Sequence, residues 1–172
     1  MIVVETPRLL IRNFEPGDEV AMEQVFGDPA VMEFSEGVRS ASWVADFIEQ
    51  NREENIPESG IIKWAVVTRE DNAVIGYCGL FVFDEPDQRP ETELGYRYRE
   101  SAWGKGYATE AARAVVNHTF RQIGINRLAA FIDPGNTGSV RVVEKLGFHY
   151  EYDLLRPGYT HPDRVYILES NH

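Results

Sequence analysis

Apolar and polar residues recur along the chain with two different periods, which separate the expected helices from the expected strands. Between Ala108 and Phe120, small and apolar residues follow the i, i+3, i+4, i+7 spacing of a helix with one buried face. Around Glu93 the pattern alternates instead and predicts a strand with Leu94, Tyr96 and Tyr98 on one face and Glu91, Glu93, Gly95 and Arg97 on the other. The two patterns predict a strand, a short loop and a helix in succession.

The same reasoning predicts the remaining elements. Residues 8–12 make the first expected strand, and Asp18 is placed to N-cap a helix that carries Val20 and Phe26. A short helix and a loop are expected over 30–39, followed by a helix capped by Ser40 or Ser42. Further strands are expected over 61–68, 73–83, 127–132, 148–155 and 164–169, with a hairpin between the first two and a helix over 138–146. Gly124 is a natural C′ residue for the helix that begins near Ala108.

The loop that precedes this helix is a candidate anion-binding site. Gly104 and Gly106 leave room for a phosphate beside the backbone, and the first-turn N–H groups of the helix have no intrahelical partners. The phosphate loop GxxxxGK[ST] is absent, and a Rossmann fingerprint would require Gly or Ala where Thr109 stands. A plain helix start with a flexible turn is the alternative for a single GxG.

The neighbouring segments favour the functional interpretation, because the string WGKGYATEA (103–111) resembles the pyrophosphate loop of the GNAT acyl-CoA-dependent N-acyltransferases. The family pattern is [Q/R]-x-x-G-x-[G/A], and Trp103 departs from it as members of the RimJ/RimL branch do. TPRLLIR (6–12), NTGS (136–139) and EKLGF (144–148) also fit that branch, so the resemblance covers nearly the whole chain. It implies a single domain over 1–172 with a central twisted mixed sheet flanked by helices, in the mixed α/β class. It also implies that acetyl-CoA contacts Tyr98, Trp103, Gly104, Lys105, Gly106, Tyr107, Ala108, Thr109, Asn136 and Ser139.

Composition limits the partners that we expect. A chain of 172 residues with 43% hydrophobic residues is expected to fold as one globular domain, and its net charge of −11 argues against nucleic acid and anionic membranes. The acidic balance suits a cationic substrate, although acidic residues also serve solubility. The single cysteine excludes an internal disulfide, and no signal peptide or membrane-spanning run is evident, so we expect a cytoplasmic enzyme, monomeric or homodimeric.

Glu93 is the first candidate for catalysis. An acid on a central strand needs a partner or a function, and the resemblance places Glu93 at an acidic position of the family's fourth strand, where it would act as the base. Ion pairing with Arg97 is the alternative. The resemblance also assigns Ser139 the role of assisting the thiolate, three residues after Asn136; a turn residue and a helix cap are the corresponding structural interpretations.

We do not expect Cys78 to act as a nucleophile, because it lies within a strand with no sign of an activating histidine. His118, His149, His161 and His172 are scattered without metal-ligand spacing, so no metal is expected. The expected function is direct acetyl transfer in a ternary complex to a primary amine, either a protein N-terminus or a small amine. The alternative is a module of the same fold that senses acyl-CoA without turnover.

Overall fold

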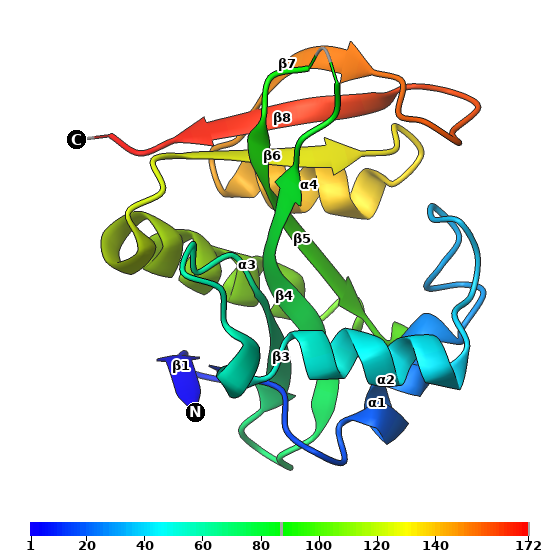
Figure 1. Cartoon of the computed structure of the whole chain (residues 1–172), viewed down its shortest axis with the longest axis vertical. Coiled ribbons are helices and arrows are strands. Elements are labelled where there is room, and N and C mark those ends of the chain that lie inside the picture. The colour runs from blue at the N-terminus through cyan, green and yellow to red at the C-terminus, as the bar shows by residue number, and fades with distance from the viewer. Residues whose placement is uncertain (87, 172) are drawn as a thin grey trace.

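The computed structural model describes residues 1–86 and 88–171, and within these residues eight strands form one sheet in the order β1-β2-β3-β4-β5-β6-β8-β7 (Figure 1). All neighbouring strands are antiparallel except β5 and β6, which are parallel. The strands are β1 (Ile2–Glu5), β2 (Leu9–Arg12), β3 (Lys63–Thr68), β4 (Val74–Phe83), β5 (Glu91–Tyr98), β6 (Arg127–Ile132), β7 (His149–Leu154) and β8 (Asp163–Glu169). The predicted mixed α/β fold with a central mixed sheet is confirmed.

Helices cover the sheet on both sides. The two on one face are α3 (Tyr107–His118), against β1, β2, β4 and β5, and α4 (Thr137–Lys145), against β6. The two on the opposite face are α1 (Glu19–Phe26) and α2 (Ala41–Gln50), which pack with apolar side chains of β3 and β4. Short 3₁₀ turns span Glu53–Asn55 and Glu100–Ala102, and a π-helical turn over Thr119–Ile123 extends α3 to Gly124. Among the described residues no helix is both long enough and apolar enough to cross a membrane.

Several local predictions are confirmed. The β3–β4 hairpin forms, and Ser40 caps α2 by accepting a hydrogen bond from the Trp43 N–H at 3.2 Å. Gly124 ends the helical segment with φ 82°, the left-handed conformation expected of a C′ glycine. These features depend on residues close in sequence, which is why local patterns predict them.

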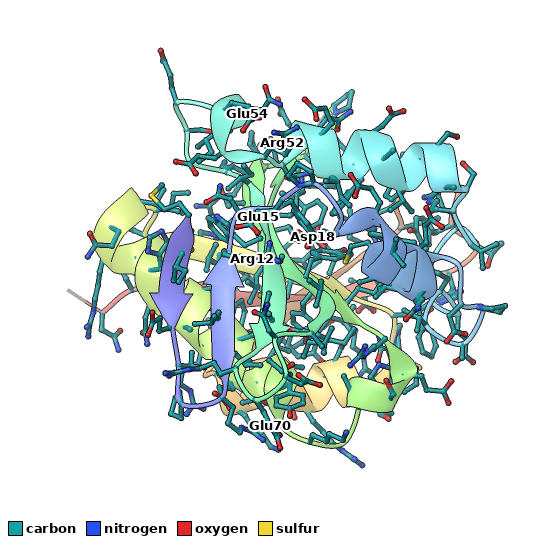
Figure 2. All side chains as sticks on the ribbon, turned by 90° about the horizontal axis from the view of Figure 1, so that it is seen from below. Arg12, Glu15, Asp18, Arg52, Glu54 and Glu70 are labelled. Atoms are coloured by element: carbon teal, nitrogen blue, oxygen red, sulfur yellow. The ribbon has the colours of Figure 1, made fainter. Side chains whose placement is uncertain are left out.

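Three predictions were wrong in detail. The first strand is β1, not residues 8–12, because Ile2–Glu5 pairs antiparallel with β2. Asp18 occupies the N-cap position of α1, but its carboxylate instead binds the Arg12 guanidinium at 2.8 and 3.0 Å and the Glu15 N–H at 2.9 Å (Figure 2). No helix forms over 30–39, because the chain makes turns there and Gly37 takes the left-handed conformation with φ 95°.

Candidate active site

The glycine loop presents a series of unpaired backbone amides at the start of α3. Gly104 and Gly106 take left-handed φ values of 71° and 80°, which a side chain would strain. The first helical hydrogen bond runs from the Glu110 N–H to the Gly106 carbonyl at 3.1 Å. Among the described residues, no protein oxygen accepts a hydrogen bond from any backbone N–H between residues 104 and 109. Six consecutive donors at a helix N-terminus form a site suited to a phosphate oxyanion.

Trp103 anchors the beginning of this loop. Its indole Nε1–H donates to the Tyr98 carbonyl at 2.9 Å and so ties the loop to the end of β5. The Tyr98 side chain is 5% exposed and belongs to the core beneath α3, so only the Tyr98 backbone lies on the loop side. The tryptophan that departs from the family pattern therefore has a structural role in positioning the loop.

Side chains from the turn between β1 and β2 hold the first turn of α3. Glu110 accepts hydrogen bonds from the Thr6 hydroxyl at 2.6 Å and from Arg8 Nε at 2.7 Å, and Arg8 Nη1 donates to the Lys105 carbonyl at 2.8 Å. Although burial opposes the change, hydrogen bonds from Thr6 and Arg8 lower the pKa of Glu110 below its ordinary value. Arg8 thus neutralises the one carboxylate in this first turn, which would otherwise repel a phosphate. Local patterns do not predict this contact, because Arg8 and Glu110 are far apart in the chain.

The two central strands separate beside this loop. β5 and β6 share a single register pair, Glu93 with Ala129, although both strands continue beyond it. Figure 1 shows β5 and β6 running in different directions, and the glycine loop follows the end of β5. After Glu93, the edge of β5 that faces β6 therefore makes no ladder with β6. This backbone edge runs from Glu93 to the glycine loop.

Glu93 lies where β5 and β6 begin to separate, and its side chain is on the face of the sheet that carries α1 and α2. Its cross-strand neighbour on β4 is Phe81, and the side chain is half-buried. Burial raises the pKa of Glu93 to about 7, and Arg156 is the strongest of the cations that oppose the rise. No ion pair joins Glu93 to Arg97, or to any other cation among the described residues. A carboxyl group of this kind is partly ionised at neutral pH and has no competing partner, as a general base requires.

The segment 30–39 covers the same face in front of β5. Arg97 Nη1 donates to Met32 Sδ at 2.8 Å and to the Val31 carbonyl at 3.5 Å. Arg97 therefore contacts this segment and forms no ion pair with Glu93. The Phe34 ring lies against Gly135 in the loop after β6, where an added Cβ would be 3.2 Å away. The segment therefore bridges β5 and the far half of the sheet, with Phe34 37% exposed.

Asn136 and Ser139 are in contact at the start of α4, shortly after the end of β6. Asn136 Oδ1 accepts a hydrogen bond from the Ser139 N–H at 3.2 Å, so Asn136 is the cap of this helix. The Tyr96 hydroxyl, from the α3 side of β5, donates to the Ser139 carbonyl at 3.4 Å. The Ser139 side chain also interacts with the Tyr96 hydroxyl, and its own hydroxyl can act as a donor. Alternation along β5 predicted the face on which Tyr96 lies but not its contact with Ser139, because that contact depends on how α4 packs against the sheet.

The remaining candidates do not join this arrangement. Cys78 is fully buried, and burial raises the pKa of its thiol well above the ordinary value, so a nucleophilic thiolate is disfavoured. His118 packs edge-on against Trp64 at 5.7 Å, and His161 Nε2 lies 2.7 Å from Asp133 Oδ2. His172 lies outside the described residues. Among the described residues, no group of three His, Cys, Asp or Glu side chains is arranged to hold a metal ion.

The fold and the site combine two diverging central strands, a run of free N–H groups suited to a phosphate and a titratable acid at the point where the strands separate. Residues 8–149 match the family model described as "Acetyltransferase (GNAT) domain", and the chain belongs to the GNAT acetyltransferases. It is 32% identical to YkkB of Bacillus subtilis (strain 168), over 96% of this chain and 94% of that protein. It is 30% identical to the uncharacterized N-acetyltransferase p20 of Bacillus licheniformis, over 91% of this chain and 86% of that protein. A GNAT-family acetyltransferase structure from Bacillus anthracis superposes with a TM-score of 0.82 at 27% identity, covering 98% of both chains.

Proposed function

We propose that this acetyltransferase transfers an acetyl group from acetyl-CoA to a primary amine in a single step within a ternary complex. The observation that carries the proposal is the unbroken run of unpaired N–H groups over residues 104–109, joined to Glu93 by the free edge of β5. GNAT acetyltransferases use acetyl-CoA. The free N–H groups suit its pyrophosphate, and Glu93 suits the reaction at its thioester.

The coenzyme would lie along this path. The backbone N–H groups of Lys105 to Thr109 would hold the pyrophosphate, with Trp103 and Gly104 shaping the entry of the loop. The pantetheine arm contains two amide groups, which the backbone of β5 between Leu94 and Tyr98 can bind as a strand would. The thioester would then lie between Glu93 and the start of α4, with Asn136 positioning the backbone of Ser139.

Acetyl transfer in this geometry needs no covalent enzyme intermediate. Glu93 would accept a proton from the acceptor ammonium through water, and the free amine nitrogen would attack the carbonyl carbon. As the new C–N bond forms and the C–S bond breaks, the nitrogen would lose its second proton through water to the departing sulfur, to which the Ser139 hydroxyl would donate a hydrogen bond, and coenzyme A would leave as the thiol. A thiol has an ordinary pKa of about 8.5, so the thiolate needs less help than the amine does.

Within the family we assign the chain to the RimJ/RimL type, on the strength of WGKGYATEA and the TPRLLIR and NTGS segments. The acceptor would approach from the face of α1 and α2, between the segment 30–39 and the loop that joins β7 to β8. Glu33 and Glu36 lie on that segment, but Glu36 pairs with Arg39 at 3.2 Å, so Glu33 contributes more of the negative potential that would attract an ammonium group.

The loop assignment is tested by a pair of glycine substitutions on one helical segment. Gly106→Val places a branched side chain among the N–H donors at φ 80°, whereas Gly124→Val imposes the same left-handed strain at φ 82° in open space. Calorimetric titration with coenzyme A should show a large loss of affinity for Gly106→Val and wild-type affinity for Gly124→Val. Equal affinities in two folded variants would refute the loop assignment, and absence of thiol release from acetyl-CoA with a broad panel of amines would refute the transferase proposal.

A further inference from the structure

Lys63 and Arg97 lie close enough to Glu93 to lower its pKa, yet within residues 1–86 and 88–171 neither forms an ion pair with a carboxylate, unlike most partly buried cations. Five partly buried cations each lie within 4.0 Å of a carboxylate: Arg12, Arg39, Arg52, Arg127 and Arg156. Lys63, Arg97 and Arg99 are also partly buried, yet no described carboxylate lies within that distance of them. Because acidic residues outnumber basic ones, 28 to 17, a shortage of carboxylates does not explain these exceptions.

Strand register places Lys63 and Arg97 near the ring of Phe81. Lys63 pairs with Gly79 and Gly79 with Gly95, while Phe81 pairs with Glu93 one row along. The Phe81 ring lies over Gly95, where an added Cβ would be 2.6 Å from the ring, and Lys63 Nζ lies 4.3 Å from the ring centroid. Arg97 follows two residues later on the same face of β5. Lys63, Glu93 and Arg97 therefore border the Phe81 ring on the acceptor side of the sheet.

Arg97 keeps donor capacity that the protein does not use. Its Nε is fully covered and has no hydrogen-bond partner among the described residues. The rest of the guanidinium contacts the Tyr77 hydroxyl, the Val31 carbonyl and the thioether of Met32, a weak acceptor. Burying a guanidinium without a counter-ion is unfavourable, whereas its fork of donors matches a carboxylate bidentately. Burial also lowers the pKa of Lys63, and the charge of Glu93, which lies beyond ion-pair distance, offsets this only in part.

We propose that the acceptor is an amine that also carries a carboxylate, as an amino acid does, with the carboxylate bound by Arg97 and Lys63 and the amine directed to Glu93. This inference rests on the proposed function and narrows it. The anionic group would give both cations a carboxylate at ion-pair distance, and Phe81 would provide the apolar surface between them. Arg97 and Lys63 would then determine specificity, while Glu93 takes part in the transfer itself.

The test compares acceptors that share a side chain. Thiol release from acetyl-CoA is measured with leucine, leucinamide and 3-methylbutylamine, and with the matching sets for phenylalanine and glutamine, at rates expressed per unprotonated amine. For the wild-type enzyme, kcat/KM should favour at least one amino acid over its amide by about 10- to 100-fold, the range for a hydrogen bond to a charged group. Spermidine and a short peptide with a free N-terminus, at equal concentration, should be poorer acceptors.

Variants assign the preference to these residues. Arg97→Gln and Lys63→Met should each reduce the ratio of acid to amide, Arg97→Gln to within about twofold of unity, and Arg97→Lys should restore part of it. Arg121→Gln removes an exposed arginine beyond the far end of α3 and should keep the wild-type ratio. Because the ratio is measured within one preparation, it does not depend on the fraction of a variant that folds.

The outcomes separate this inference from the function on which it rests. Thiol release with amides, spermidine or peptides equal to or better than that with the amino acids would refute a carboxylate-bearing acceptor and leave the transferase proposal intact. A wild-type ratio in Arg97→Gln would equally refute the role of Arg97. Absence of thiol release with every amine would refute the proposed function, and this inference with it.

Discussion

Replacing Glu93 by glutamine retains the shape of the side chain but removes its charge and basicity, and the structure predicts opposite effects on stability and on activity. The pKa of Glu93 is raised from 4.5 to about 7 by burial, so the folded protein binds this proton more tightly than the unfolded chain does. The contribution to the free energy of unfolding is therefore greatest below pH 4.5 and is lost as the pH rises through about 7. The carboxylate form is the destabilising one.

The magnitude follows from the size of the shift. At about 1.4 kcal/mol per pKa unit, the rise corresponds to roughly 3 kcal/mol for a fully desolvated group. Because Glu93 keeps part of its surface exposed, solvent screening reduces the expected effect to about 1–2 kcal/mol. Glu93→Gln should accordingly match the wild type near pH 5 and be more stable by that amount at pH 8, as measured by urea unfolding at each pH.

Activity should change in the other direction. Loss of a general base typically costs about 10²–10⁴-fold, so kcat/KM should fall by about this factor just above pH 7. Wild-type kcat/KM should decline below pH 7 as Glu93 becomes protonated. The defect of the variant should also shrink above the pKa of the acceptor amine, where the free amine is abundant. Glu70→Gln, a substitution of an exposed carboxylate in the β3–β4 turn at the periphery of the molecule, serves as the control and should change neither property (Figure 2).

One pair of results would refute this reasoning. If Glu93→Gln is less stable than the wild type at every pH and its activity defect does not vary with pH, Glu93 is a structural ion-pair partner and not a base. Higher stability together with unchanged activity would retain the account of burial and reject the catalytic role.

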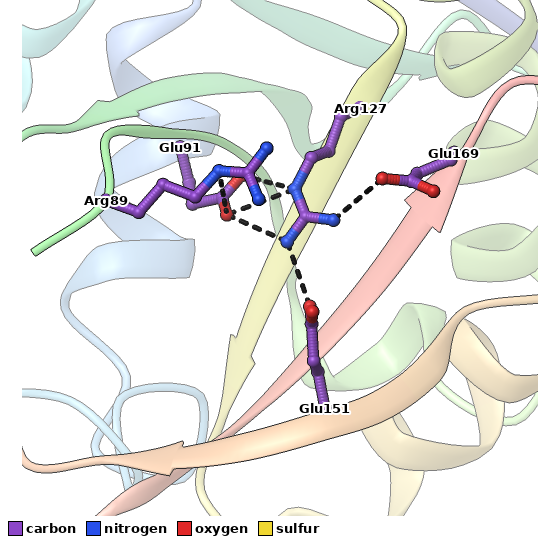
Figure 3. A network of polar contacts seen from close by, with 5 residues as sticks. All are labelled: Arg89, Glu91, Arg127, Glu151 and Glu169. Atoms are coloured by element: carbon purple, nitrogen blue, oxygen red, sulfur yellow. Dashed lines mark hydrogen bonds and ion pairs between the residues drawn. The ribbon is translucent and has the colours of Figure 1, made fainter.

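Three further predictions concern other parts of the molecule. Cys78→Ala should retain wild-type activity and trap no acetyl label, because a buried thiol of raised pKa forms no acyl-enzyme; labelled enzyme after acid quenching would contradict this. Ser139→Ala should lower kcat by less than Glu93→Gln does at pH 7.5, since the thiolate is a good leaving group. A larger loss would mean that Ser139 contributes more to the rate than Glu93. Arg127 links Glu91, Glu151 and Glu169 across β5, β6, β7 and β8 (Figure 3), and Arg127→Met should cost about 3–5 kcal/mol in unfolding free energy because it leaves the covered Glu91 carboxylate with only the more distant Arg89. Arg127→Met combined with Glu91→Gln should recover part of that loss. If it does not, the cost of Arg127→Met does not come from leaving the Glu91 carboxylate unpaired.

The sequence by itself determined the features that depend on neighbours within a few residues. Helical periodicity and two glycines predicted that a loop would present free N–H groups at the start of α3, because φ preferences and unpaired first-turn donors are local properties. Alternation along β5 predicted that Glu93 and Arg97 would share a face, because successive side chains of a strand point to opposite sides.

Only the tertiary structure decided what these residues face. The cross-strand neighbour of Glu93, the packing of the Phe81 ring over Gly95 and the position of Lys63 depend on the register between strands that come from different parts of the chain. Arg97 was an equally good ion-pair partner for Glu93 by sequence, yet it turns to the segment 30–39 instead. Local patterns cannot settle such contacts, because many pairings satisfy the same alternation, and only the packing of the whole sheet decides among them.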